Sequence, residues 1–488
     1  MKSKRSLLTW RRWLAPPAPT HGGLIGEPTN SLNGQCPAQW RNRFLAPAEL
    51  TYEPDRKRIL MLASTLARGG CERQILSTAV GLNERNYHVA VLAFARPPAG
   101  QSLEAEIRER SIPLSYSDEF PHDLKSERLN GLALSLPDDM FNYVASVQSA
   151  ILEYRPHVVH AWSDYAAIVG GKMAVALGVP RIILGQRNVS PPHHLREHIA
   201  TFREGYRILA ANPHVVLTNN SARNASEYES WLDLAAGTII VVRNGFVPNT
   251  MRIPSPDAVR QKRRDLGIPG RAKVVGSLMR FVEQKDPALW LATAAQIARD
   301  RDDVSFVLGG YGELRDKISS EIRNMGLSRR FALLDGVTDL GMFYSLLDVF
   351  LMTSRFEGTP NVIIEAQAAT CPIVTTDAGG IKETVADGVT ARIVSNRSPE
   401  KLAAAVVEVL DNDNWRSRAG KAGPSFVQQR FGHKSMIART LQLYYPPTFI
   451  GGLRAQVKER WSALKSYSAE RNLQSKECVQ RFRPFGTE

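Results

Sequence analysis

The chain has 488 residues, 43% of them hydrophobic and 23% charged, proportions typical of a soluble globular protein that is long enough for two domains. Its net charge is +14, and both ends are basic: residues 1–50 hold seven Lys/Arg against two Asp/Glu, and residues 451–488 hold eight against four. A basic surface suits several anionic partners. Because zinc-finger spacing and interleaved aromatic and basic residues are missing, we expect no nucleic-acid partner.

The basic N-terminal segment lacks the uninterrupted apolar stretch of a secretory signal. No run of about 18 apolar residues predicts a transmembrane helix. Four scattered cysteines (Cys36, Cys71, Cys371 and Cys478) follow neither a metal-ligand nor a disulfide spacing. We therefore expect a cytoplasmic protein whose basic ends suit peripheral contact with the inner face of the cell membrane.

The first half of the chain alternates short strands with helices. Residues 1–50, rich in Pro, Gly, Asn and Arg, are expected to form a mobile tail. Residues 51–248 are expected to form an N-terminal Rossmann-like domain, because such alternation predicts crossovers onto a mostly parallel sheet. Its predicted strands lie at 57–64, 87–95, 156–163, 180–188, 214–220 and 237–245, and its helices include 71–86, 165–178 and 221–235.

A second series of the same kind fills residues 249–430, which we interpret as a C-terminal Rossmann-like domain. Its predicted strands lie at 272–280, 303–310, 331–337, 348–354 and 371–378, with helices at 287–300, 313–326 and 360–369. The predicted fold is therefore α/β, with two tandem doubly wound domains facing each other across a cleft. Each binds ligands at the carboxyl ends of its strands.

The end of the chain predicts a closing helix region at 431–450 and a basic extension at 451–488. In this extension Leu453, Val457, Trp461 and Leu464 share one face of an amphipathic helix. Such a face suits either a membrane surface or packing on the protein's own core, and the sequence leaves both readings open.

The stretch SRFEGTPNVIIEA, residues 354–366, places two carboxylates eight residues apart. Thr359 followed by Pro360 predicts a capping hydroxyl and a first helical residue, so the free N–H groups of the first turn would suit a phosphate. Glu357 lies just before this helix. Glu365 lies inside it among apolar residues, where a buried carboxylate must accept hydrogen bonds, and ribose hydroxyls are suitable donors.

Other loops of the same domain also suit a nucleotide. Arg280 and Lys285 follow the strand at 272–280, where they would neutralise a diphosphate. Glycines that allow a ligand to approach the backbone lie at the ends of two further strands. They are Gly309, Gly310, Gly312, Gly379 and Gly380.

These segments resemble the retaining nucleotide-sugar glycosyltransferases of family 4, which have the GT-B fold. The resemblance covers roughly residues 57–445, through VGSLMRFVEQKDP, LGGYGELRDKI and DVFLMTSRFEGTPNVIIEAQAATCPIVTTDAGGIKETV, with LARGGCERQ, RPHVVHAW, LTNNSA and VVRNGF as weaker landmarks. It implies that Glu365 binds the ribose and Glu357 the donor sugar. It also implies that Arg280 and Lys285 hold the diphosphate, helped by the backbone of Gly358, Thr359, Pro360 and Asn361.

Transfer from a nucleotide sugar requires stabilisation of the departing diphosphate, which these cations and the helix start would supply without a metal or other cofactor. The string DND at Asp411–Asp413 matches a metal-binding pattern, but its place at a helix end favours turn chemistry. Retention, as the resemblance implies, allows the donor phosphate itself to take the acceptor proton. The template of two carboxylates flanking the bond is then not required.

The N-terminal domain should carry the acceptor. Gly69 and Gly70 follow the first strand, where the backbone could approach the donor diphosphate or the acceptor. His160, at the end of the strand PHVVHAW, is a candidate for contact with the sugar or the acceptor hydroxyl, with a structural role as the alternative. Arg187 and Asn188 stand where many relatives have histidine, so no general base is assigned.

The leading hypothesis is a metal-independent, hexosyltransferase-like enzyme. It would move a sugar from a nucleotide-diphosphate donor to a glycan or lipid-linked acceptor in surface polysaccharide or glycolipid synthesis. A transferase with a soluble acceptor, of the sucrose or glycogen type, is the alternative within the class. A nucleotide-sugar epimerase and an inactive nucleotide-sugar-binding protein are alternatives from other classes.

Overall fold

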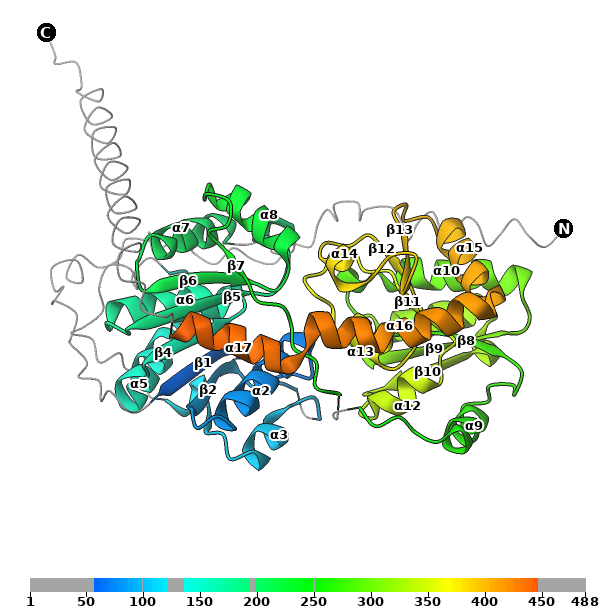
Figure 1. Cartoon of the computed structure of the whole chain (residues 1–488), viewed down its shortest axis with the longest axis horizontal. Coiled ribbons are helices and arrows are strands. Elements are labelled where there is room, and N and C mark those ends of the chain that lie inside the picture. Colours follow the sequence, from blue (N-terminus) through cyan, green and yellow to red (C-terminus); the bar gives the residue numbers. More distant parts are fainter. Residues whose placement is uncertain (1–56, 99, 121–135, 194–197, 249–250, 446–488) are drawn as a thin grey trace, which may run out of the picture.

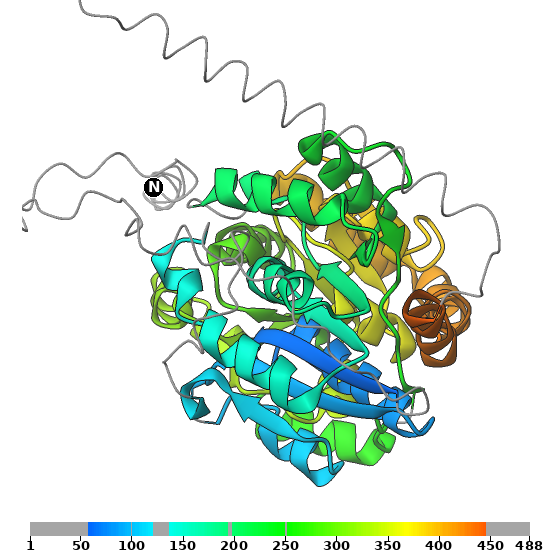
Figure 2. The ribbon, with the colours of Figure 1, turned by 90° about the vertical axis from the view of Figure 1, so that its left-hand side faces the viewer.

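The computed structural model describes residues 57–98, 100–120, 136–193, 198–248 and 251–445. These residues form two parallel sheets with helices packed on them, which lie end to end along the molecule (Figure 1). Figure 2 views the molecule from the N-terminal half, with the C-terminal half behind it. The predicted α/β class with two tandem Rossmann-like units is confirmed. The tail at 1–50 and the extension at 451–488 lie outside the described residues.

The N-terminal sheet has seven strands in the order β3-β2-β1-β4-β5-β6-β7, all parallel. The strands are β1 (Arg58–Thr65), β2 (His88–Ala95), β3 (Leu114–Tyr116), β4 (Val158–Trp162), β5 (Arg181–Gln186), β6 (Val215–Asn219) and β7 (Ile240–Val241). The helices are α2 (Gly70–Asn83), α3 (Glu104–Glu109), α4 (Asp138–Phe141), α5 (Val144–Tyr154), α6 (Asp164–Ala176), α7 (Ile199–Ala210) and α8 (Ala222–Leu232).

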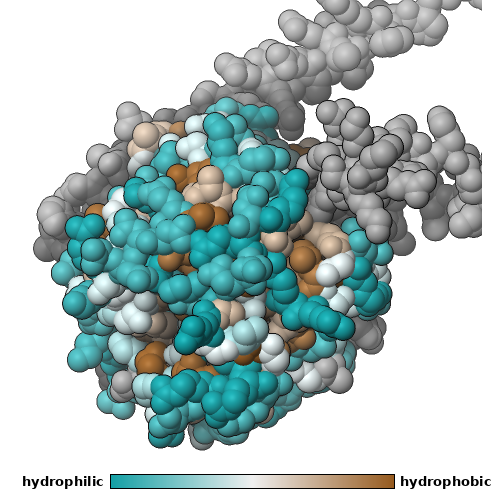
Figure 3. Space-filling model, turned by 90° about the vertical axis from the view of Figure 1, so that its right-hand side faces the viewer, coloured by the Kyte–Doolittle hydropathy of each residue, from teal (hydrophilic) through white to brown (hydrophobic). Residues whose placement is uncertain are grey.

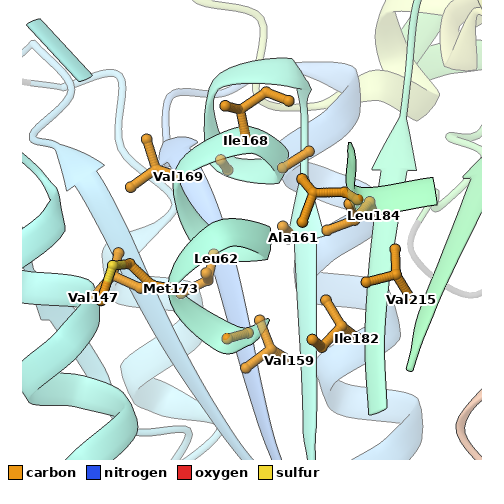
Figure 4. Close-up of a cluster of buried hydrophobic side chains, with 14 of the residues drawn as sticks. Leu62, Val147, Val159, Ala161, Ile168, Val169, Met173, Ile182, Leu184 and Val215 are labelled. Atoms are coloured by element: carbon orange, nitrogen blue, oxygen red, sulfur yellow. The ribbon is translucent and has the colours of Figure 1, made fainter. Parts of the chain in front are cut away.

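Both faces of this sheet are buried, which explains why its strands are continuous apolar runs. On one face, Leu62, Val159 and Ile182 from three neighbouring strands pack with Ile168 and Met173 of α6 (Figure 4). Helix α6 is buried along most of its length, so it anchors the strands whose carboxyl ends meet the other half.

The C-terminal sheet has six parallel strands in the order β10-β9-β8-β11-β12-β13. They are β8 (Lys273–Arg280), β9 (Val304–Tyr311), β10 (Phe331–Asp335), β11 (Val349–Met352), β12 (Ile373–Thr376) and β13 (Ala391–Val394). The helices are α9 (Pro256–Asp265), α10 (Pro287–Asp300), α11 (Arg315–Asn324), α12 (Leu340–Ser345), α13 (Asn361–Ala368), α14 (Ile381–Thr384), α15 (Pro399–Asp411), α16 (Asp413–Phe431) and α17 (His433–Tyr444).

The last two helices connect the halves. Helix α16 packs on α13 of the C-terminal half, whereas α17 packs on α2 and β5 of the N-terminal half, and together they cross the molecule in Figure 1. Ile437 and Tyr444 of α17 belong to the second buried cluster of the N-terminal sheet. The closing helix therefore completes a core that lies mostly far upstream in the sequence.

The sequence prediction missed β3 and β13 and placed too long a strand at 237–245, where β7 spans two residues. All three are edge strands or short neighbours of an edge, so they carry too few apolar residues to give a pattern. The end of the molecule formed by the C-terminal half is largely hydrophilic, with scattered apolar residues (Figure 3). Among the described residues, no helix is long and apolar enough to cross a membrane.

Candidate active site

The two sheets turn their carboxyl-end loops toward each other, and a partly buried ion pair joins two loops of the C-terminal half. Glu357 follows β11, and its side chain is 7% exposed. Lys285 lies in the short 3₁₀ turn Glu283–Lys285 after β8, and its Nζ is 2.5 Å from Glu357 Oε1. Adjacent parallel strands β8 and β11 explain how residues 72 positions apart meet.

Helix α13 begins immediately beyond Glu357, one residue later than predicted. Pro360 is its N-cap and Asn361 its first residue, and no side chain caps it. The predicted capping role of Thr359 is wrong: its hydroxyl instead donates to the Asn220 carbonyl of the N-terminal half, at 2.8 Å. The first-turn N–H groups of α13 thus lack a side-chain acceptor within the described residues, as a phosphate site requires.

Glu365 is buried in α13, and its carboxylate accepts hydrogen bonds as expected. Tyr344 donates its hydroxyl to Glu365 Oε2 at 2.8 Å, and Arg73 Nη2 lies 3.1 Å from Oε1. Burial and then the Glu365 charge hold the pKa of Tyr344 well above its usual range, so this hydroxyl keeps the proton that it donates. The donors in the structure are therefore protein groups, and Arg73 comes from the N-terminal half.

Arg280 ends β8 and is exposed. Within the described residues no carboxylate lies at ion-pairing distance from it, although its charge is felt at Glu72 and at Tyr311. Burial raises the pKa of Glu72, and Arg280 opposes this rise. A cation at this strand end is thus free to meet an anionic ligand.

The starts of α2 and α13 touch across the two halves. The amide of Asn361 donates to the Gly70 carbonyl at 2.8 Å, and a side chain on Gly70 would contact that amide. A Cβ on Gly69 would lie 2.2 Å from Glu72 Oε2. A Cβ added to Gly358 would lie 2.4 Å from the Arg187 carbonyl, so the backbone leaves no room for a side chain there. Gly358 thus permits the close approach of the halves, whereas a Cβ on Gly70 would make only an ordinary contact.

His160 is not where the prediction placed it. Strand β4 continues to Trp162, and His160 is buried in the strand, with Nδ1 2.7 Å from the Tyr444 hydroxyl of α17. Its ring stacks on Trp162 at 4.5 Å. Burial, and then Arg187, hold the pKa of His160 well below its usual range. The neutral ring thus links β4 to the closing helix.

Several residues of the site were not singled out from the sequence. Asn244 donates to the Thr359 carbonyl at 2.9 Å and to Asn361 Oδ1 at 2.7 Å, and Gln74 exchanges two hydrogen bonds with the Gly245 backbone. The run GGCERQ contains Arg73 and Gln74, and VVRNG contains Asn244. The polar residues in these two runs were the signal by which the sequence could have pointed to Arg73, Gln74 and Asn244.

The part of the chain that the structure describes groups no three His, Cys, Asp or Glu side chains as a metal site would. Asp411 pairs with Arg301, and Asp413 pairs with Arg416. Between them, Asn412 caps α16 by accepting from the Trp415 N–H at 2.9 Å. The turn interpretation of DND agrees with these contacts.

Comparison with known proteins follows the same division into halves. The family described as glycosyl transferases group 1 matches residues 258–426, and the family described as glycosyl transferase 4-like domain matches residues 69–245. These ranges hold the donor-side loops and the α2 and β4 segments, respectively.

Relatives and solved structures agree. The chain is 28% identical over 411 residues to the Vi polysaccharide biosynthesis protein VipC/TviE of Salmonella typhi, covering 78% of this chain and 70% of that protein. It is 26% identical over 387 residues to a D-inositol 3-phosphate glycosyltransferase of Corynebacterium aurimucosum, covering 74% and 87%. The crystal structure of Anabaena HepE with UDP and glucose superposes with a TM-score of 0.67 at 22% identity, covering 79% and 99%. The chain therefore belongs to the family 4 glycosyltransferases, enzymes with the GT-B fold.

Proposed function

We propose that the chain is a retaining transferase that moves a sugar from a nucleotide-diphosphate donor to a hydroxyl of a glycan or lipid-linked acceptor, in surface polysaccharide or glycolipid synthesis. The observation that carries the proposal is the partly buried Lys285–Glu357 pair beside the start of α13, which no side chain caps, with Glu365 further along the same helix. A cation, a carboxylate and free N–H groups within one loop cluster suit a phosphorylated sugar.

Each residue has a role in this proposal. Glu365 binds the ribose hydroxyls, for which Arg73 moves aside or shares the carboxylate. Lys285 and Arg280 hold the diphosphate, and the backbone of Gly358 to Asn361 adds N–H donors. Glu357 contacts the sugar and keeps Lys285 in place. Partial burial of Lys285 and Glu357 makes their charges more effective toward a developing charge than they would be in water.

The transfer itself balances without another reactant. The acceptor oxygen forms a bond to the anomeric carbon while the bond from that carbon to the β-phosphate oxygen breaks, and the electron pair leaves with the diphosphate. The acceptor proton passes to the departing phosphate oxygen, so the protein supplies charge and orientation. We propose that no metal takes part.

The acceptor proposal is supported by the names of relatives. One relative acts in Vi polysaccharide biosynthesis, which favours a growing glycan or its lipid-linked form. Another is a D-inositol 3-phosphate glycosyltransferase, which favours the second candidate, a small soluble acceptor. For the first candidate we propose a location at the inner face of the cell membrane.

A donor panel tests the proposal. The purified chain is incubated with UDP-, GDP- and ADP-sugars, with and without EDTA and with membrane lipid extract, a soluble sugar or neither, and released nucleoside diphosphate and labelled lipid are measured. The proposal expects one donor to be turned over only when lipid is added. Turnover restored by a soluble sugar favours the second candidate, and turnover that EDTA abolishes overturns the metal-free step. An epimerised donor would instead reveal an isomerase.

A further inference from the structure

A narrow pocket lies beside the donor loops, at the carboxyl ends of β4, β5 and β6. Trp162, Arg187 and Asn219 line it from these strand ends, Arg243 from the segment after β7, and α17 closes its other side. Its space in this structure is that of about one water molecule. A larger group would enter only if side chains of this lining moved.

The buried polar atoms of this lining that have no partner are all hydrogen-bond donors. They are the indole Nε1 of Trp162, Nδ2 of Asn219, Nε of Arg187 and Nε of Arg243, each without a hydrogen-bond partner within the described residues. Trp162 is 2% exposed and Asn219 1% exposed. Buried donors are normally satisfied, so four beside one pocket indicate a missing acceptor.

Arg187 indicates that the missing acceptor is an anion, because its guanidinium has no carboxylate partner among the described residues. Its guanidinium lies 3.8 Å from the centre of the Trp162 ring, and Nη1 donates to Asn244 Oδ1 at 3.1 Å. No carboxylate of the described residues lies at ion-pairing distance from it, and burial lowers its pKa to about 10. Arg187 is half-buried and its Nε is fully buried; a charge in such a position is normally paired, so this site is incomplete without an anion.

The other cation of the lining is partly satisfied. Arg243 Nη2 lies 3.7 Å from Glu383 Oε2, but Glu383 is held by the Ser221 hydroxyl and by two N–H groups at the start of α8. Its carboxylate is therefore directed at α8. Arg243 Nε still lacks an acceptor within the described residues.

We propose that this pocket binds an anionic group, a phosphate or a carboxylate, carried by the acceptor. The proposal rests on the proposed function, because the pocket adjoins the donor loop: Asn244 accepts from Arg187 and donates to the Thr359 carbonyl. An anion on Arg187 would hold the acceptor next to the loop that holds the donor sugar. The planar guanidinium suits two-point binding of either anion.

The test begins with inorganic phosphate and the full chain. Phosphate is titrated by calorimetry into the chain alone, and again into the chain whose donor site is saturated with the nucleoside diphosphate that it binds. We expect saturable binding that Arg187→Gln weakens by about 10–100-fold, the loss typical of a hydrogen bond to a charged group. Arg264→Gln, an exposed arginine on α9, is the matched control and should bind phosphate normally.

A second variant keeps the test valid if Arg187→Gln does not fold. Asn219→Asp is nearly isosteric and puts a carboxylate beside the buried N–H groups that lack an acceptor. It should abolish phosphate binding without lowering the thermal midpoint, because the new charge pairs with Arg187. Glucose 6-phosphate, glucuronate and glucose, offered as probes to the wild type, distinguish a phosphate from a carboxylate.

Three outcomes overturn the proposal: no saturable phosphate binding, which means that the pocket holds only water; unchanged binding in Arg187→Gln; or loss of binding once the donor site is saturated, which assigns the anion to the donor. If no nucleoside diphosphate binds at all, the proposed function fails first, and that failure is seen in the saturation step.

Discussion

Glu365 lies where a buried carboxylate already has two protein donors, Tyr344 and Arg73. A nucleotide must therefore replace or join contacts that exist before it arrives. Because Arg73 comes from α2, the residue that we assign to the ribose also senses how the halves are placed. Donor binding and the position of α2 are thus linked through one side chain.

Glu365→Gln should weaken donor binding while leaving the fold intact. The amide loses the charge that two donors and the ribose share, so we expect the Kd of the nucleoside diphosphate to rise by about 10–100-fold. Isothermal titration measures it, with Glu408→Gln, an exposed carboxylate paired with Arg392, as control. Equal Kd values in all three proteins would remove Glu365 from the site.

His160 predicts a pH dependence of stability. Its folded pKa is lowered by burial, so below about pH 6.5 the unfolded chain takes up a proton that the folded chain does not. Stability is therefore lost as the pH falls through this window, by up to about 1.4 kcal/mol per pH unit for one proton. Urea unfolding at pH 7.5 and pH 5.5 (about one unit on each side of that pKa) measures this loss.

His160→Gln should flatten this dependence, whereas His214→Gln, an exposed histidine, should keep it. The comparison is between slopes, so a general destabilisation by either substitution does not matter. If the slope of His160→Gln equals that of the wild type, the buried neutral imidazole is not the cause.

At the scale of elements, the approach of the donor loop to β5 depends on Gly358. A Cβ there would lie 2.4 Å from the Arg187 carbonyl and 2.8 Å from Asn220 Oδ1, closer than real contacts allow. The loop after β11 and the loop after β5 can thus touch only through a residue without a side chain.

Gly358→Ala should keep each half folded and hold the halves apart. We expect a loss of turnover on the order of 100-fold, the cost of displacing a reacting group by about 1 Å. Gly270→Ala is the control, since its Cβ would meet nothing within 4 Å. Donor turnover is measured for both variants. Full activity in Gly358→Ala would show that turnover does not need the contact between the loops after β11 and β5.

The elements also show what the sequence allowed. Long strands such as β8 and β9 were predicted because both faces of a parallel sheet are buried and the residues are apolar throughout. The start of α13 was misplaced because Thr-Pro satisfies the local rule for a cap, but the Thr359 hydroxyl bonds to the Asn220 carbonyl instead. A tertiary contact thus overrode a local preference.

At the scale of the whole molecule, Glu383 joins the halves. Burial alone would raise its pKa, but hydrogen bonds from the Arg223 and Ala222 N–H groups and from Ser221 outweigh burial and leave the pKa lowered. These donors begin α8 of the N-terminal half, whereas Glu383 lies on α14. The Glu383 carboxylate therefore forms a hydrogen-bonded contact between the two halves.

We predict that this contact is lost at low pH and in Glu383→Gln. A carboxylate with a lowered folded pKa contributes stability above its unfolded pKa of about 4.5, and this stability is lost as the pH falls through the folded value. Glu383→Gln should mimic that loss at neutral pH, increasing hydrogen exchange in the first turn of α8 by about tenfold or more. Glu313→Gln, an exposed carboxylate, is the control. Unchanged exchange would show that other contacts hold the halves.

Contacts of this kind could not be predicted from the sequence. Arg73 meets Glu365 and Asn244 meets Thr359 across distances of hundreds of residues, and no local pattern encodes such pairs. The proximity of Lys285 and Glu357 could be expected, because their loops follow parallel strands and share one sheet edge. The contact of His160 with Tyr444 could not be foreseen, because Tyr444 lies on a helix that returns from the other half.

The most direct measurement compares wild type and Glu357→Gln in single-turnover release of nucleoside diphosphate from the donor panel. Removing the carboxylate leaves Lys285 without its partner and the sugar without its contact. We predict that the wild type turns over one donor, and that Glu357→Gln does so at least about 100-fold more slowly while binding the diphosphate with little change. Equal rates in the two proteins, or no turnover of any donor by the wild type, would contradict the proposed role of this site.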